Sequence, residues 1–128
     1  MSIKLLLYVA LGGAIGAVGR YTATVAVAQW SDGDFPYGTL VVNTVGSFLL
    51  GCLLAALALG WTPSNEFRSL MQVGILGAFT TFSTFSMDAY NQLSRGDYFA
   101  ASLYIGGSVL IGIIALITGV ALIRQVFT

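Results

Sequence analysis

The sequence predicts an all-α membrane protein in which each subunit contributes four transmembrane helices. Of its 128 residues, 57% are hydrophobic and only 8% are charged, whereas about a quarter of the residues in soluble domains are charged. The mean hydropathy of the chain is +0.90. The apolar residues fall into four stretches, and each is close to the ~20 residues that a helix needs to cross the hydrocarbon core. We therefore expect one transmembrane domain over residues 1–128 and no soluble domain.

The four expected spans cover residues 3–28, 38–59, 70–93 and 99–123. Short connectors separate them and carry most of the charged residues. Tryptophan and tyrosine favour the headgroup level of a bilayer, and such residues mark the ends of the spans: Trp30, Tyr37, Trp61 and Tyr98. This pattern predicts four consecutive crossings of the membrane.

Pairs of small residues four positions apart recur in three of the spans. In lipid, such pairs let two helix backbones approach closely. The pairs are Gly12 with Gly16, Ser47 with Gly51, Ser108 with Gly112, and Ala115 with Gly119. This pattern predicts close helix packing and says nothing about function.

Three polar residues inside the spans are more informative. Arg20 lies in the first span, Asn43 in the second and Asp88 in the third. Charges and amides within a membrane are costly, so they usually mark a pathway or have a partner. The first and third spans run in the same direction, which brings Arg20 and Asp88 toward the same face and allows an ion pair. Alternatively, Arg20 extends its side chain to the interface.

The third span is unusually rich in glycine and hydroxyl side chains between Gly74 and Ser86. Glycine, serine and threonine are mediocre helix formers, and hydroxyl groups compete for backbone hydrogen bonds. We therefore expect a helix that is broken near residues 77–81. Irregular backbone at membrane depth is tolerated where it is buried in protein or lines a cavity, and its freed carbonyls can coordinate a cation.

The composition excludes several classes of function. There is no histidine, and Cys52 is the only cysteine, so neither a zinc site nor a disulfide framework is available. An intramembrane enzyme would need a nucleophile with a base or a metal, and Asp88 is the only carboxylate inside a span. We therefore expect a protein that is not an enzyme.

The loop charges give a weak bias in orientation. The side of the N-terminus carries Lys4, Arg68 and Arg124, and the other side carries Arg95, with Arg20 added if it reaches the interface. Because lysine and arginine set topology, a chain with so small a difference could insert both ways and form an antiparallel dimer. A single fixed topology with a cytoplasmic N-terminus is the alternative.

Four blocks of sequence resemble the fluoride channels of the Fluc/CrcB family. The first span matches from Gly12 to Tyr21 and the second from Gly38 to Phe48. The third matches from Gly74 to Ser86, where the run Thr-Thr-Phe-Ser-Thr-Phe-Ser is highly specific, and the fourth offers only Tyr104 and Ser108. The match covers essentially the whole chain.

The resemblance implies a passive, fluoride-selective channel in a prokaryotic plasma membrane. It implies an antiparallel homodimer with two pores and a structural sodium ion at its centre. The backbone carbonyls of Gly77 and Thr80 would hold the sodium ion. Asn43, Phe82 and Phe85 would contact fluoride, with Thr39, Ser83, Tyr104 and Ser108 extending a hydroxyl-lined path and Arg20 near the vestibule. Asp88, like Arg20, is interpreted as a vestibule or structural charge.

The chain departs from the family pattern at a few positions. Ala78 stands where a second glycine is usual, and Asp88 replaces a glutamate. The hydroxyl track of the fourth span does not continue at Gly112 and Leu116, so part of the pore lining differs. Two alternatives remain: a small multidrug-type exporter, which would need a carboxylate in the first span where this chain has Arg20, and a membrane assembly subunit.

Overall fold

The computed structural model describes all 128 residues and contains only helices and the turns between them. Four helical rods are long and apolar enough to cross a membrane. Three of them are single helices: α1 (Ile3–Trp30), α2 (Tyr37–Ala58) and α6 (Tyr98–Phe127). The third rod is built from α3 (Asn65–Arg68), the π-helical segment η1 (Ser69–Leu76), α4 (Gly77–Phe79) and α5 (Phe82–Ser94). The predicted all-α, four-span fold is confirmed, although the third rod begins at Asn65 rather than at residue 70.

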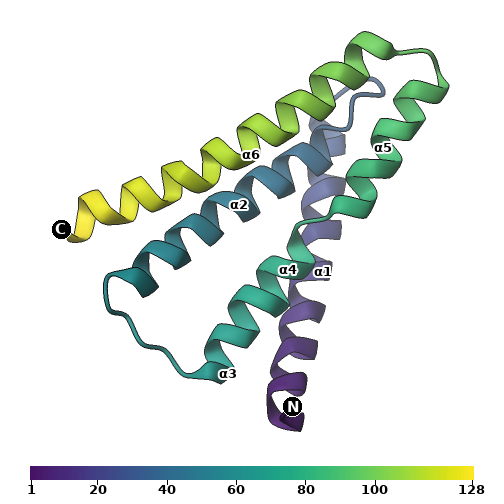
Figure 1. The fold of residues 1–128 in the computed structure, drawn as a ribbon. Coiled ribbons are helices and arrows are strands. Elements are labelled where there is room, and N and C mark those ends of the chain that lie inside the picture. The colour runs from purple at the N-terminus through teal and green to yellow at the C-terminus, as the bar shows by residue number, and fades with distance from the viewer.

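The helices form two arms that diverge toward the chain termini (Figure 1). In one arm α2 lies alongside α6, and in the other α1 runs beside α3, η1 and α4. Helix α5 continues from the second arm to the short turn that leads into α6. The third rod therefore joins the two arms, and its irregular centre lies against α2.

Glycines set the closest contacts within each arm, as the spacing of small residues predicts. A methyl group added at Gly12 would collide with the carbonyl oxygen of Leu70, and one added at Gly119 would collide with that of Phe48. Gly16 meets η1 in the same way at Ile75, and Gly51 meets α6 at Leu116. Backbone-to-backbone packing therefore holds α1 on η1 and α2 on α6.

Two spans end in the same glycine-dependent cap. At the end of α2 the N–H of Gly60 donates to Leu57 and that of Trp61 to Ala56, and Gly60 has a φ of +108°. At the end of α5, Gly96 repeats the pattern with a φ of +78°. These are Schellman motifs, in which glycine takes the left-handed conformation that other residues avoid. The second motif folds α5 back toward α6.

Most of the molecular surface is apolar. Only 14 of the 128 residues are buried within the chain, and large aliphatic side chains are exposed along every spanning helix. Soluble monomers rarely expose contiguous apolar surface on this scale. The exposed surface is therefore one that lipid or another protein covers.

Candidate functional site

The third rod is interrupted at Thr80 and Thr81, within the region where the sequence predicts a break. Helix α4 ends at Phe79, and both threonines adopt extended backbone conformations before α5 begins at Phe82. An interruption of this kind frees backbone N–H and C=O groups that must find other partners in a membrane. The surrounding side chains satisfy most of them.

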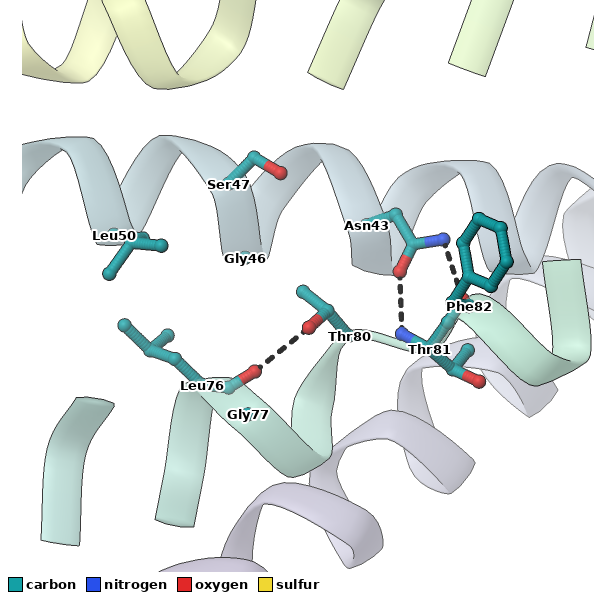
Figure 2. Close-up of a pocket in the computed structure, with 9 residues that line it drawn as sticks. All are labelled: Asn43, Gly46, Ser47, Leu50, Leu76, Gly77, Thr80, Thr81 and Phe82. Atoms are coloured by element: carbon teal, nitrogen blue, oxygen red, sulfur yellow. Dashed lines mark hydrogen bonds between the residues drawn. The ribbon is translucent and has the colours of Figure 1, made fainter. Parts of the chain in front are cut away.

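Asn43 of α2 bonds to both backbone groups of Thr81 (Figure 2). The N–H of Thr81 donates to Oδ1 of Asn43 at 2.7 Å, and Nδ2 of Asn43 donates to the carbonyl oxygen of Thr81 at 3.1 Å. These two bonds fix which way the amide points, and they leave one of its two N–H donors free. Asn43 therefore has a structural role at the break that sequence reasoning missed.

Other side chains complete the break. The hydroxyl of Thr81 accepts from the N–H of Thr84 at 3.1 Å and so caps α5. The hydroxyl of Thr80 donates to the carbonyl oxygen of Leu76 at 3.1 Å. Arg20 donates from Nε to the carbonyl oxygen of Ala78 at 3.0 Å.

The carbonyls of Gly77 and Thr80 differ from these. No side chain donates to either oxygen. In a continuous helix the N–H of Thr81 would bond to Gly77 and that of Thr84 to Thr80, but they donate instead to the side chains of Asn43 and Thr81. Both residues line a cavity of about 300 Å³ that opens to the outside of the chain. Two carbonyl groups without hydrogen bonds, at membrane depth, are suited to bind a cation.

The cavity that Gly77 and Thr80 line lies between α2 and the broken rod (Figure 2). Four residues line it from α2 and five from the broken rod: Asn43, Gly46, Ser47 and Leu50, and Leu76, Gly77, Thr80, Thr81 and Phe82. A methyl group at Gly46 would collide with the methyl of Thr80. The cavity therefore depends on a glycine at the point where α2 approaches the break.

A second, smaller cavity brings together four of the residues expected in the fluoride path. Asn43, Phe82, Phe85 and Ser108 line it, together with Ser47, Val109 and Gly112, and its volume is about 140 Å³. Asn43, Ser47 and Phe82 line both cavities, so the two adjoin. The hydroxyl oxygen of Ser108 is buried and has no hydrogen-bond partner in the chain. Gly112, a position where the hydroxyl track stops, lies in the wall.

The two phenylalanines belong to a longer aromatic row. The ring centroids of Phe82 and Phe85 are 5.6 Å apart, and Phe85 lies 5.1 Å from Tyr104. Phe35 continues the row, with its ring perpendicular to that of Tyr104 at 5.7 Å. Phe85 is half-buried, whereas Phe82 is 79% exposed within the chain. Phe35 was missed by sequence reasoning, since nothing in the connector before α2 distinguishes it.

Asp88 is held by two hydroxyl groups. Thr39 donates to its Oδ2 at 2.6 Å, and the hydroxyl of Tyr104 donates to the same oxygen at 3.0 Å. Thr39 is 5% exposed and Tyr104 only 1%. Three of the predicted residues therefore form one cluster, which joins α2, α5 and α6.

The suggested ion pair between Arg20 and Asp88 is wrong for this chain. The ion pairs that form are Lys4 with Glu66 at 3.5 Å and Arg95 with Asp97 at 3.1 Å. Arg20 turns to the freed carbonyl of Ala78 instead, and Asp88 turns to the hydroxyls of α2 and α6. Each charged group is satisfied by a polar group close to it, and this leaves neither available for an ion pair.

The remaining predicted residue, Ser83, lies outside both cavities. It is exposed, and its hydroxyl oxygen is 3.4 Å from that of Thr81. Throughout the chain, no group of three or more histidine, cysteine, aspartate or glutamate side chains could hold a metal ion.

The chain is similar to known proteins along nearly its whole length. The model of the family described as "CrcB-like protein, Camphor Resistance (CrcB)" matches residues 7–120. A protein of Rhodospirillum centenum is 43% identical over 95% of this chain and 97% of its own length. One of Hahella chejuensis is 44% identical over 98% of this chain and 99% of its own. A protein of Nitrobacter winogradskyi is 39% identical over 98% of this chain and 100% of its own length.

All three relatives carry the name "Fluoride-specific ion channel FluC". The family model covers most of the chain, and the relatives match it almost from end to end. The four helices that are long and apolar enough to span a membrane agree with a multi-pass membrane protein. The chain belongs to the CrcB-like family.

Proposed function

We propose that this protein is a fluoride-selective, passive channel that lets fluoride leave the cell. The observation that carries the proposal is the small cavity in which Asn43, Phe82, Phe85 and Ser108 meet. These residues come from three helices and supply one amide, two aromatic rings and a hydroxyl. The names of the relatives, which match nearly the whole chain, support fluoride as the ion.

The cavity offers chemistry suited to a small anion. A selective pore must replace the water shell of fluoride with hydrogen-bond donors. The free N–H of Asn43 and the hydroxyl of Ser108, which has no partner, are such donors. The edge of an aromatic ring carries partial positive charge, so the rings of Phe82 and Phe85 add weak attraction. Several weak sites in sequence let an ion bind and still leave.

The Asp88 cluster lies beyond the rings in the proposed path. Its hydroxyls come from Thr39 and Tyr104, and Tyr104 packs directly on Phe85. Both hydroxyls donate to the carboxylate, and these charge-assisted hydrogen bonds stabilise the negative charge of Asp88. One hydroxyl can turn from the carboxylate to a passing anion while the other still donates to Asp88, so the cluster can receive fluoride from the rings.

We further infer that two copies assemble as an antiparallel homodimer with two pores. The larger cavity opens to the outside of the chain at the break, and Phe82 beside it is mostly exposed. A second copy would cover both. The nearly balanced loop charges support insertion in both orientations, and a two-fold axis in the membrane plane would present the same contacts to each subunit.

A structural sodium ion fits the break. The carbonyls of Gly77 and Thr80 supply two oxygens without hydrogen bonds, and a two-fold axis would double them to four. Backbone carbonyls at unwound helix segments are known ligands for sodium. A fixed cation of this kind would tie the subunits together and raise the local potential in favour of an anion.

Fluoride efflux from liposomes that contain the purified protein tests the function. We expect fluoride to leave down its gradient when a potassium ionophore balances charge, without a proton gradient and with chloride largely retained. Empty liposomes are the control. Fluoride release that requires a proton gradient would exclude a passive channel, and equal chloride release would exclude fluoride selectivity. Movement of sodium in a fixed ratio with fluoride would exclude a structural sodium ion.

A further inference from the structure

A third cavity lies away from the candidate pathway, between the start of α1 and the start of the third rod. Its volume is about 280 Å³. It shares no residue with the two cavities at the break. Six residues line it: Leu5, Asn65, Arg68, Ser69, Gln72 and Val73. Nothing in the proposed transport mechanism uses these residues.

The polar lining of this cavity is suited to a negative group. Its four polar side chains can all donate hydrogen bonds, and no carboxylate lines it. Arg68 supplies the one charge, and its guanidinium has no ion pair or hydrogen bond within the chain. The nearby carboxylate of Glu66 is already paired with Lys4 at 3.5 Å. A free guanidinium among neutral donors recognises a phosphate, often with two parallel bonds.

The position of the cavity selects the source of that phosphate. It lies where the third span begins. Trp61, in the connector before this span, packs on Phe67, the residue before Arg68, with their rings 5.5 Å apart. Tryptophan favours the headgroup level of a bilayer, which puts the start of this span near that level. Leu5 and Val73 form its apolar wall, and Val73 is 58% exposed. A polar pocket that continues into an exposed apolar surface matches a molecule with a charged head and an acyl tail.

We propose that this cavity binds the phosphate of an anionic glycerophospholipid of the phosphatidylglycerol type. A zwitterionic headgroup fits less well, because its ammonium group would find no carboxylate in the lining. The hydroxyls of a glycerol headgroup, in contrast, can bond to the amides of Asn65 and Gln72. Basic pockets between helices at the membrane surface bind anionic headgroups in this manner.

Thermal unfolding of the purified protein in detergent tests the site, with phosphatidylglycerol or phosphatidylcholine added. A ligand that binds only the folded state raises the melting temperature, and we expect phosphatidylglycerol to raise it by roughly 5 °C more than phosphatidylcholine. R68Q should abolish this difference. R124Q is the matched control, because Arg124 lies on the same side of the membrane and also lacks an ion pair, but does not line the cavity.

Native mass spectrometry gives an independent count of bound lipid. Wild-type protein and R124Q should retain one phosphatidylglycerol per subunit, and R68Q should lose it. Equal loss in R68Q and R124Q would mean that the lipid responds to net charge alone, which overturns the site. Retention by R68Q overturns it too. Inorganic phosphate that reproduces the full thermal shift without lipid would show a simple anion site and overturn the lipid assignment.

Discussion

Asn43 combines two tasks in one side chain. Its amide completes the hydrogen bonding of Thr81 at the break, and the residue lines both cavities there with one N–H left free. Its presence inside a span marked it as functional in the sequence. The structural task could not be predicted, because it depends on a contact with a residue 38 positions away.

Replacing Asn43 by Asp should nearly abolish fluoride flux. The change removes both N–H donors, the free one and the one bonded to the carbonyl oxygen of Thr81, and places a negative charge in the proposed fluoride path. Like charges 4 Å apart repel by about 4 kcal/mol at an effective dielectric of 20, which corresponds to orders of magnitude in throughput. The carboxylate can still accept from the N–H of Thr81, so the protein should fold. Flux from liposomes beside a size-exclusion profile checks this, and wild-type flux in N43D would remove Asn43 from the mechanism.

The phenylalanines should respond differently to replacement by isoleucine. Both changes keep much of the apolar volume and remove the polarised ring edge, so flux should fall in at least one variant if the rings contact fluoride. F85I should also cost about 0.5–1.5 kcal/mol of stability, because the contact with Tyr104 is lost. Phe82 is mostly exposed within the chain, so F82I should not disturb the fold of the subunit. Wild-type flux in both variants would reduce the rings to packing.

Gln92 gives a prediction about stability. Its side chain is 1% exposed, and neither its amide nitrogen nor its amide oxygen has a partner in the chain. An unpaired buried polar group costs about 1–3 kcal/mol, so Q92M, which keeps the shape of the side chain, should stabilise the protein by a similar amount. Chemical unfolding in detergent measures this. The neighbouring, exposed Asn91 provides the control, since N91M should change stability by less than about 0.5 kcal/mol. A destabilised Q92M would mean that the amide has a partner outside the chain.

At the scale of the element, the third rod could be predicted further than the others. Its glycine and hydroxyl content predicts the break, and the break lies at Thr80 and Thr81. Composition cannot show which side chains donate hydrogen bonds to the freed carbonyl groups. Arg20 reaches Ala78 across 58 positions of sequence, a contact that depends on how α1 packs on α4. For this reason the suggested pair of Arg20 with Asp88 failed although both residues were recognised.

Double-mutant cycles distinguish the two arrangements. The effects of R20Q and D88N on the unfolding free energy should be additive within about 0.5 kcal/mol, because residues with no shared partners act independently. D88N and Y104F should couple by about 0.5–3 kcal/mol, since the carboxylate and the hydroxyl share a bond of 3.0 Å. Unfolding free energies of the six proteins, wild type included, test both cycles. Strong coupling of Arg20 with Asp88 would restore the ion pair that the structure lacks.

At the scale of the whole molecule, the sequence predicts the number of spans because hydrophobic length decides it. The relation between the two arms is less accessible. It depends on close contacts at glycines such as Gly12, Gly51 and Gly119, and small residues at that spacing are common to most membrane helices. The spacing therefore identifies packing faces without identifying their partners. The two cavities at the break lie where α2 approaches the broken rod, so residues of their lining could be predicted only through the family resemblance.

The proposed antiparallel dimer makes a prediction about topology. Two lysines added on the N-terminal side, S2K with T62K, should bias insertion one way, and D32K with D34K on the other side should bias it the opposite way, since lysine and arginine dominate orientation. All four positions are exposed. Ser2 makes no capping hydrogen bond, so its loss should not weaken α1. Each biased variant alone should lose most fluoride flux, because no oppositely oriented copy is available to complete the dimer.

Co-expression of the two biased variants should restore flux, because each then supplies the orientation that the other lacks. Fluoride efflux from liposomes with protein purified from single and paired expression measures this directly. A neutral pair, S2Q with T62Q, controls for effects of the substitutions themselves and should keep wild-type flux. If each lysine variant works fully alone, one orientation suffices to build the pore. The subunits would then be parallel or independent, and the sodium site shared across a two-fold axis in the membrane plane would be excluded with the antiparallel dimer.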